Sequence, residues 1–212
     1  MAEQTEQTKV AVIYYSATGN VYQLARSIVE GAEKAGAEVR LRKARELAPE
    51  EAIASNQGWA DHRLETQNVV EASGDDIVWA DAVVFGSPTR YGLVSAQLKQ
   101  FIDTLGALWA QGALADKVYS TFTSASTNHG GNETTMVALN NVYSHFGGII
   151  VPPGYTDPSK FADGNPYGAT FVSGQGDRPV DDVARAAAAF QGRRVAEIAT
   201  ALKTGLAAAA RT

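Results

Sequence analysis

The feature that most constrains this chain is an unbroken run of β-branched and aromatic residues, Lys9 to Tyr15, that ends in a polar cluster, Ser16 to Asn20. A strand that is apolar at successive positions is typical of burial on both faces, as in a parallel sheet. Directly after the cluster, apolar residues recur at helical spacing from Val21 to Ala32. A buried strand followed at once by a helix opens a βαβ unit and predicts an α/β fold.

Four further strand signals follow, and helical signals separate them. Parallel strands need crossover connections, so this alternation predicts helices on both faces of one sheet. We predict a doubly wound, five-stranded parallel sheet in three α/β/α layers, with the flavodoxin-like strand order as the natural candidate. The polar residues 43–81 show only weak periodicity, and the Gly- and Pro-rich residues 152–178 are too many for an ordinary connection. The further strands are expected at Glu38–Arg42, Ala82–Phe85, Val118–Phe122 and Ile149–Val151, and the further helices at Leu98–Leu105, Glu133–His145 and from Pro179 onward.

Composition narrows the range of functions. The 212 residues fit a single domain, which we place at residues 9–204 between a disordered start, 1–8, and a frayed tail, 205–212. The net charge of −5 gives no basic field, so nucleic acid is not expected as a partner. The chain has no cysteine and no histidine pair at metal-ligand spacing, so we predict no disulfide, no thiol nucleophile and no metal. It also lacks a signal-peptide core and a membrane-spanning stretch, so we expect a cytoplasmic protein.

The cluster after the first strand has the composition of a phosphate-binding loop. A phosphate at a helix N-terminus is held by unpaired backbone N–H groups and favoured by the helix dipole. Ser16 and Thr18 can add hydroxyl donors, Gly19 lets the backbone approach the anion closely, and Asn20 can cap the helix. A simple helix cap is the alternative interpretation, but the position directly after a buried strand favours phosphate binding.

Other ligand-binding signatures of α/β folds do not match. The cluster is neither the Gly-rich dinucleotide fingerprint nor the Gly-Lys loop of nucleotide triphosphatases, so a mononucleotide fits better. Receiver domains of the same topology need acidic residues after the first and third strands. Here those ends carry Tyr15-Ser16 and Gly86-Ser87.

Longer motifs then give a specific resemblance. Residues 14–20 read YYSATGN, 86–92 read GSPTRYG, 106–114 read GALWAQGAL and 166–169 read PYGA. The first motif closely resembles the FMN phosphate loop of flavodoxins. The three later motifs, in this order and spacing, resemble signatures of the tryptophan repressor-binding protein (WrbA) family of NAD(P)H:quinone oxidoreductases, and the similarity covers about residues 9–202. The resemblance implies an FMN cofactor, hydride transfer from NADH or NADPH through the flavin to quinones, and a homotetramer, with a dimer as the alternative.

The resemblance also assigns site residues. It implies that Thr18 and Trp109 contact substrate and that His145 is catalytic. The segment 126–131 is one residue longer and less Gly-rich than is usual for the family, which leaves individual contacts within it open. The residues assigned to FMN are Ser16, Ala17, Thr18, Gly19, Asn20, Val21, Pro88, Thr89, Arg90, Tyr91, Gly92, Ser124, Ala125, Ser126, Thr127, Asn128, His129 and His145.

Four of the assigned site residues have both a functional and a structural interpretation. Tyr91 and Arg90 follow the third strand, where open α/β sheets bind ligands, but this segment can also be a plain turn. A core position is the commoner one for a tryptophan, but the setting of Trp109 between Gly106 and Gly112 suggests an exposed loop, and the resemblance implies a wall of the substrate cavity. His145 can donate a proton during quinone reduction, or it can be a structural histidine.

Three functions compete at this stage. The leading one is an enzyme that oxidises NAD(P)H and reduces quinones by two electrons in a ping-pong reaction at one shared site. A flavodoxin-type electron carrier is the second, but such carriers are shorter and very acidic. A regulatory partner protein is the third, and no feature of the sequence supports it.

Overall fold

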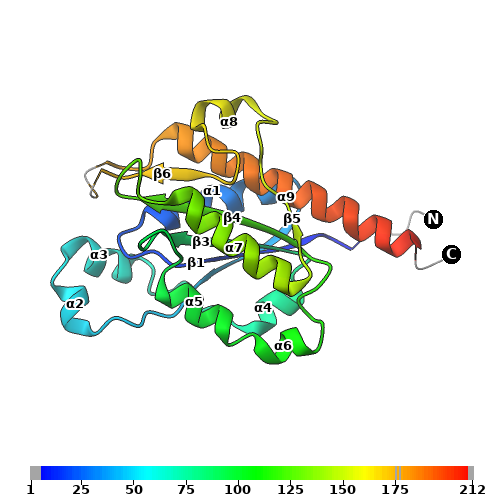
Figure 1. The fold of residues 1–212 in the computed structure, drawn as a ribbon, viewed down its shortest axis with the longest axis horizontal. Helices are drawn as coiled ribbons and strands as arrows, with labels where there is room; N and C mark the ends of the chain where they lie inside the picture. The colour runs from blue at the N-terminus through cyan, green and yellow to red at the C-terminus, as the bar shows by residue number, and fades with distance from the viewer. Residues whose placement is uncertain (1–5, 175, 177, 210–212) are drawn as a thin grey trace.

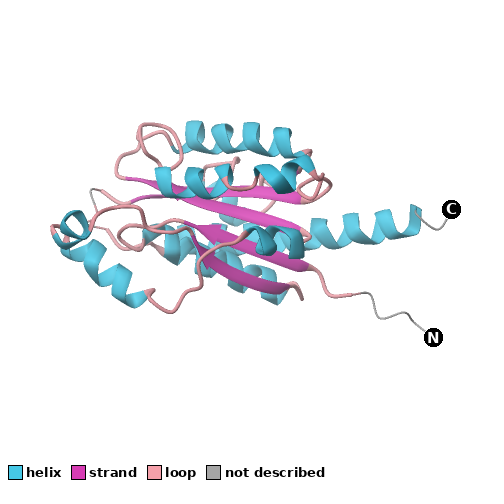
Figure 2. Ribbon diagram, turned by 90° about the horizontal axis from the view of Figure 1, so that it is seen from below, coloured by secondary structure: helices cyan, strands magenta, loops and turns pink. Residues whose placement is uncertain are grey.

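A central parallel sheet lies between two layers of helices (Figures 1 and 2). The structure is a computed structural model that describes residues 6–174, 176 and 178–209. Its strands are β1 (Lys9–Tyr14), β2 (Glu38–Lys43), β3 (Ala82–Pro88), β4 (Val118–Ala125), β5 (Ile149–Ile150) and β6 (Thr170–Val172). Its helices are α1 (Asn20–Lys34), α2 (Glu50–Ala54), α3 (Gln57–Glu65), α4 (Gly74–Trp79), α5 (Ala96–Asp103), α6 (Gly106–Ala110), α7 (Asn132–Phe146), α8 (Pro158–Asp163) and α9 (Asp182–Ala209).

The strand order β2-β1-β3-β4-β5 confirms the predicted flavodoxin-like topology, and the assigned strand pairings are all parallel. The fifth position holds two short strands rather than one. β5 pairs with Val118 and Tyr119 at the start of β4, whereas β6 pairs with residues 123–125 at its end. The sequence predicted β5 but missed β6, which lies inside the segment expected to be a long loop.

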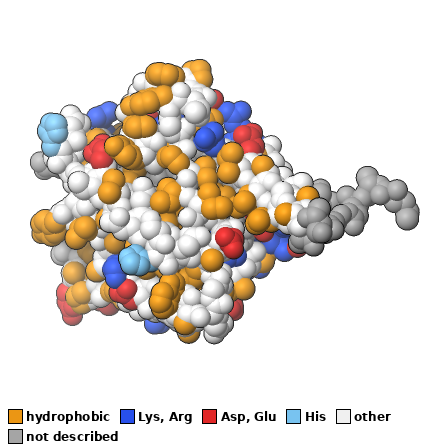
Figure 3. Space-filling model, turned by 45° about the vertical axis from the view of Figure 1, so that its right-hand side comes forward, with side chains coloured by type: hydrophobic (Ala, Val, Ile, Leu, Met, Phe, Trp, Pro, Cys, Tyr) orange, Lys and Arg blue, Asp and Glu red, His pale blue; other side chains and the backbone are white. Residues whose placement is uncertain are grey.

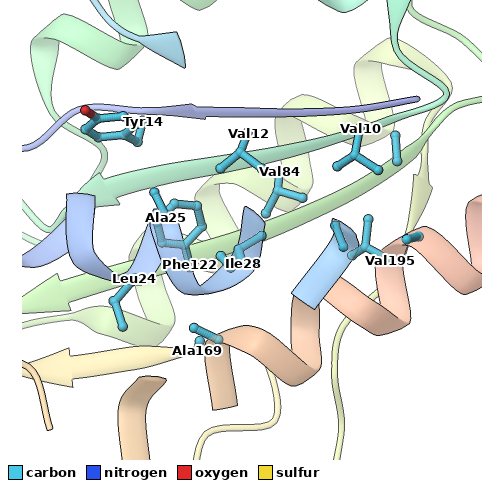
Figure 4. Close-up of a cluster of buried hydrophobic side chains, with 14 of the residues drawn as sticks. Val10, Val12, Tyr14, Leu24, Ala25, Ile28, Val84, Phe122, Ala169 and Val195 are labelled. Atoms are coloured by element: carbon cyan, nitrogen blue, oxygen red, sulfur yellow. The ribbon is translucent and has the colours of Figure 1, made fainter. Parts of the chain in front are cut away.

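Burial of β1 on both faces is confirmed. Val10, Val12 and Tyr14 belong to one apolar cluster with α1 and α9, and the alternate residues Ala11 and Ile13 belong to a second cluster on the opposite face. Figure 4 shows the first cluster, in which side chains of α1 and α9 meet the strands. Burying one such Val or Ile side chain stabilises the fold by about 1.5–3 kcal/mol.

Two glycines allow α1 and α9 to pack backbone to backbone. A Cβ atom on Gly31 would lie 1.9 Å from the carbonyl oxygen of Ala189, and one on Gly192 would lie 2.0 Å from that of Ile28. Any larger side chain at either position would therefore push the helices apart. This close contact fixes α1, and with it the loop that precedes α1.

The excursion between β5 and β6, residues 151–169, is held by buried polar groups. Lys160 is fully buried on α8, where its ammonium group pairs with Asp163 and donates to the carbonyl of Gly168. Burial lowers the pKa of Lys160 and raises that of Asp163. Gln191 of α9 accepts a hydrogen bond from Ala169 N at 2.7 Å and donates to Ser120 Oγ at 2.7 Å. These contacts return the chain to the sheet edge as β6.

The two chain ends are only partly described. Of the expected disordered start, residues 1–5 lie outside the described residues, while Thr8 is hydrogen-bonded to Thr200 at 2.6 Å. Helix α9 continues past residue 204 to Ala209, and residues 210–212 of the expected tail lie outside the described part. The domain boundaries therefore stay a prediction. Over the described residues, none of the helices combines the length and apolar character that a membrane crossing requires.

Candidate functional site

The loop between β1 and α1 is shaped around Gly19. This residue is the N-cap of α1 and has φ 99°, in the left-handed region that favours glycine. Ser16 Oγ accepts a hydrogen bond from Gly19 N at 3.1 Å and so closes the loop on itself. The sequence analysis expected Asn20 to cap the helix, which is wrong, because Asn20 is already the first helical residue.

Helix α1 therefore begins without a side-chain cap. The first N–H groups of a helix have no partner inside the helix, and here no capping side chain takes their place. An anion bound at this end would receive those N–H groups together with the positive end of the helix dipole. The loop thus has the geometry expected of a phosphate site.

Two cavities flank this loop, one of about 420 Å³ and one of about 520 Å³. Most of the predicted FMN residues line the larger one. Arg90 is the one charged side chain among the described residues that line the larger cavity, so a bound phosphate would meet no carboxylate there. From the predicted set, this cavity is lined by Ser16, Ala17, Thr18, Asn20, Val21, Pro88, Thr89, Arg90, Ser124, Ala125 and Ser126.

The turn after β3 is tied to the start of α7. Arg90 and Leu93 exchange two backbone hydrogen bonds, and the residues between them, Tyr91 and Gly92, both have positive φ, 54° and 77°. Positive φ at both central positions is the mark of a tight type I′ turn. Thr89 accepts from Thr135 Oγ1 at 2.8 Å, which connects this turn to α7. Tyr91 is thereby held fully exposed at the tip.

The loop from β4 to α7 forms another side of the site. Its last residue, Gly131, is the N-cap of α7 with φ 95°, so this helix also begins without a side-chain cap. The side chains of residues 126–129 are exposed. Six predicted FMN residues do not line the cavity and lie in the three loops around it: Gly19, Tyr91, Gly92, Thr127, Asn128 and His129.

The sequence analysis missed part of the cavity wall. Asn56, Gly58 and Trp59, at the start of α3, line it opposite the phosphate loop, and Ser173 and Gly176 line it after β6. Asn56 caps α3, because its side chain accepts a hydrogen bond from Trp59 N at 3.1 Å. An Asn cap in a polar stretch was the available signal, but nothing in the sequence placed this helix beside the loop.

Trp109 and His145 lie together but away from the cavity. Trp109 Nε1 donates to the carbonyl of His145 at 2.8 Å, and Trp109 is 56% exposed. Helix α7 starts at the carboxyl edge of the sheet and runs back to its amino edge, so His145 lies about 20 Å along the helix axis from Asn132. Just beyond it, Ile149 pairs with Val118, the first residue of β4. One chain therefore does not bring these two residues to the cavity (Figure 1).

Comparison with curated proteins places this chain among close relatives of one kind. A protein named NAD(P)H dehydrogenase (quinone) from Deinococcus radiodurans is 43% identical over 93% of this chain and 98% of its own length. A protein of the same name from Sinorhizobium fredii is 41% identical over 92% of this chain and 98% of its own.

Solved structures agree with the fold. A flavodoxin, WrbA-like protein from Agrobacterium tumefaciens superposes with a TM-score of 0.63 at 26% identity, covering 91% of this chain and 98% of its own. An archaeal flavodoxin, with a TM-score of 0.59 and 17% identity over 91% of this chain and 99% of its own, shows the shared fold alone. The family model described as NADPH-dependent FMN reductase matches residues 8–161, and the chain belongs to this family of FMN-binding proteins with a flavodoxin-like fold.

Proposed function

We propose that this chain is an FMN-dependent NAD(P)H:quinone oxidoreductase. The observation that carries the proposal is the identity of 41–43%, over nearly the full length of both chains, to proteins named for that activity. The cavity at the carboxyl edge of the sheet supports it, because open α/β folds bind their ligands there.

The residues of the cavity fit the parts of FMN. The uncapped start of α1, with Ser16 and Thr18, would hold the phosphate, and the turn at Thr89 and the segment 124–126 would flank the ring. Bound FMN supplies the two-electron redox chemistry. The chain's own residues would bind it, orient it and leave one face open to substrate, and we expect Thr18 and the exposed Tyr91 to lie near that face.

A neighbouring subunit would supply the remaining predicted residues. Trp109 and His145 lie at the amino edge of the sheet, so they can reach a flavin only in another copy of the chain. We therefore propose a homotetramer, with a dimer as the smaller alternative, in which the Trp109–His145 edge of one subunit covers the cavity of another. In that position the His145 imidazole would deliver the proton that quinone reduction requires.

Exposed apolar residues support assembly of this kind. Figure 3 shows apolar side chains at the top of the molecule, where α8 lies. Contiguous exposed apolar surface is typical of interfaces between subunits. The large apolar residues exposed on α6, on β5 and around α8 are Trp109, Ile149, Ile150, Tyr155, Phe161 and Tyr167.

The mechanism proposed for this site is ping-pong. Hydride transfer needs the reacting atoms within roughly 3–3.5 Å, so one open face admits one planar ring at a time. NAD(P)H and quinone should then occupy the same site in turn, which gives parallel lines in steady-state plots and competition between quinone and NAD(P)H. Intersecting lines would contradict a single shared site. A cytoplasmic location remains part of the proposal, on the sequence argument alone.

Anaerobic absorbance spectroscopy of the purified protein tests the function. We expect a flavin spectrum that is bleached by NADH or NADPH and restored by a benzoquinone with two-electron stoichiometry. Absence of FMN after reconstitution, or bleaching that quinone does not reverse, would contradict the proposed activity. Accumulation of a one-electron flavin radical during turnover would instead favour the electron carrier.

A further inference from the structure

The α2–α3 hairpin is clamped beside the phosphate loop by Glu46. This carboxylate accepts hydrogen bonds from Tyr15 Oη at 2.9 Å, Trp59 Nε1 at 3.0 Å and Gln97 Nε2 at 2.9 Å. Burial alone would raise the pKa of Glu46, but these bonds and one from Ala48 N hold that pKa below its usual value. Glu46 thus stays charged and joins the end of β1, the start of α3 and α5.

The clamped hairpin faces the phosphate loop directly. A Cβ atom on Gly58 would lie 3.9 Å from Thr18 Cγ2, so the start of α3 and the loop are in contact across the cavity. Trp59 and Ser16 line both this cavity and a second one of about 420 Å³ on the other side of the loop. The loop is therefore enclosed by α1 on one side and by the hairpin on the other.

His62 of α3 supports the loop from outside. A Cβ atom on Gly19 would lie 3.4 Å from His62 Nδ1, which is ordinary contact distance, and His62 is only 5% exposed. The His62 ring packs on Tyr22 of α1, with 5.3 Å between ring centroids. Its Nδ1 atom is 3.1 Å from Glu65 Oε2, within hydrogen-bond distance. The imidazole is thus fixed in place against the backbone of the loop.

The groups around His62 make its protonation sensitive to an anion bound at the phosphate loop. Burial lowers the pKa of His62, and nearby Lys43 of β2 lowers it further, while Glu65 opposes both. The cavity that His62 lines also carries two cations and two carboxylates, Arg45, Arg63, Glu46 and Glu71. The phenols Tyr14 of β1 and Tyr22 of α1 pack nearby, and burial raises the pKa of Tyr14, so it is neutral. An anion bound at the loop adds negative charge and favours the imidazolium form.

We propose that the α2–α3 hairpin is a second wall of the FMN phosphate site, and that His62 is its positioning residue, which holds the loop at Gly19 and, when protonated, attracts the phosphate electrostatically from behind the loop. The inference rests on the proposed placement of FMN. This role of His62 is separate from the roles of the phosphate-loop motif and of the residues expected at the flavin ring. It also predicts that FMN binding is coupled to the uptake of a proton by His62.

The test is the affinity for FMN, measured by quenching of flavin fluorescence between pH 6 and 8.5, for the parent and for His62→Phe. Phenylalanine keeps the packing on Tyr22 but carries no proton. At pH 8.5 the two proteins should bind FMN within about threefold of each other. At pH 6 the parent should bind about tenfold more tightly, as expected for one added charge near a phosphate.

Riboflavin and two variants separate the phosphate effect from other changes. Riboflavin lacks the phosphate, so both proteins should bind it equally at every pH. Glu65→Gln removes the carboxylate that favours protonation and should shift the pH dependence to lower pH. If His62→Phe does not fold, as judged by circular dichroism, the parent and Glu65→Gln provide the comparison. Leu64→Ala, exposed on the same helix, should behave like the parent.

Equal pH profiles for FMN in the parent and His62→Phe, or an equal loss of riboflavin binding, would overturn the role of His62. A parent that binds neither FMN nor riboflavin would instead contradict the proposed function. The two failures are therefore distinct.

Discussion

The two edges of the sheet carry very different chemistry. At the carboxyl edge, a cavity is lined mostly by small residues, many of them polar, together with Arg90, Trp59 and the start of α1, whose N-cap is a glycine. At the amino edge, an exposed tryptophan is fixed to the end of α7 by a hydrogen bond to His145 O. The first edge can bind an anionic cofactor without a neighbour, whereas the second presents side chains to whatever lies outside the chain. One chain therefore holds the two halves of the proposed site far apart, at opposite edges of its sheet.

The largest expected effect comes from Gly19→Asp at the carboxyl edge. The substitution puts a Cβ atom on a residue at φ 99° and adds a carboxylate beside the proposed phosphate position. FMN affinity should fall about 100-fold, equivalent to about 2.7 kcal/mol, in equilibrium dialysis. Gly36→Asp is the matched control, because Gly36 has φ 89° at the other end of α1, with open space around it. An equal loss in both variants would mean that strain, not the phosphate, is responsible.

His145→Ala tests the amino edge. If the imidazole delivers a proton, reduction of quinone should slow by roughly 100-fold, while bleaching of the flavin by NAD(P)H stays nearly intact. Stopped-flow absorbance measures the two half-reactions separately. Asn141→Ala, exposed on the same helix, should leave both rates unchanged. Equal slowing of both half-reactions would indicate a structural role for His145.

Light scattering measures the oligomeric mass of the unsubstituted protein and so tests whether the amino edge is covered by another subunit. At micromolar concentration we expect the mass of a tetramer, or of a dimer in exchange with it, because the exposed apolar residues on α6, β5 and α8 need a partner surface. A purely monomeric mass in a protein with full quinone activity would contradict a site shared between subunits.

The smallest expected effect is the pH dependence of stability in the FMN-free protein. Burial lowers the pKa of His62 in the folded chain, whereas the unfolded chain binds this proton near pH 6.5. Between these two pKa values the unfolded state binds more protons than the folded state. The contribution of His62 to the free energy of unfolding is therefore fully present above about pH 6.5 and is lost as the pH falls toward the lower, folded-state pKa. Urea unfolding from pH 5.5 to 7.5 should show this slope in the parent and a smaller one in His62→Phe. Identical slopes would contradict a buried, neutral His62.

The sequence predicted the elements that are buried on both faces and missed those held by distant contacts. Lys9–Tyr14 is apolar at successive positions after Lys9, so its pattern identified a strand buried on both faces. The start of β4 was predicted as Val118–Phe122, and the structure extends this strand to Ala125, with Ser and Thr residues buried among the apolar ones. By contrast, β6 has only three residues, and its position depends on Gln191, which lies far along the chain and accepts from Ala169 N. No local pattern encodes such a contact.

The same limit applies to the candidate site: its local signatures could be recognised in the sequence, and its distant contacts could not. The loop at Gly19 and the turn at Thr89 have local signatures, since each requires positive φ or a helix start at a fixed spacing. Trp59 and His62 were missed as wall residues because the hairpin has no clear apolar stripe and is positioned by Glu46, a side-chain contact with partners from several elements. The separation of His145 from the loop also depends on the direction of α7, which no motif records.

The most direct test of a site shared between subunits is to mix two variants that are each impaired in a different half of the site. Gly19→Asp subunits should lack FMN but keep an intact Trp109–His145 edge, and His145→Ala subunits should bind FMN but lack the proton donor. If the site is shared between subunits, refolding the two together should restore a substantial fraction of quinone reductase activity in mixed oligomers. If the oligomers are shown to be mixed but their activity is no greater than the sum of the two variants refolded separately, the site is not shared between subunits.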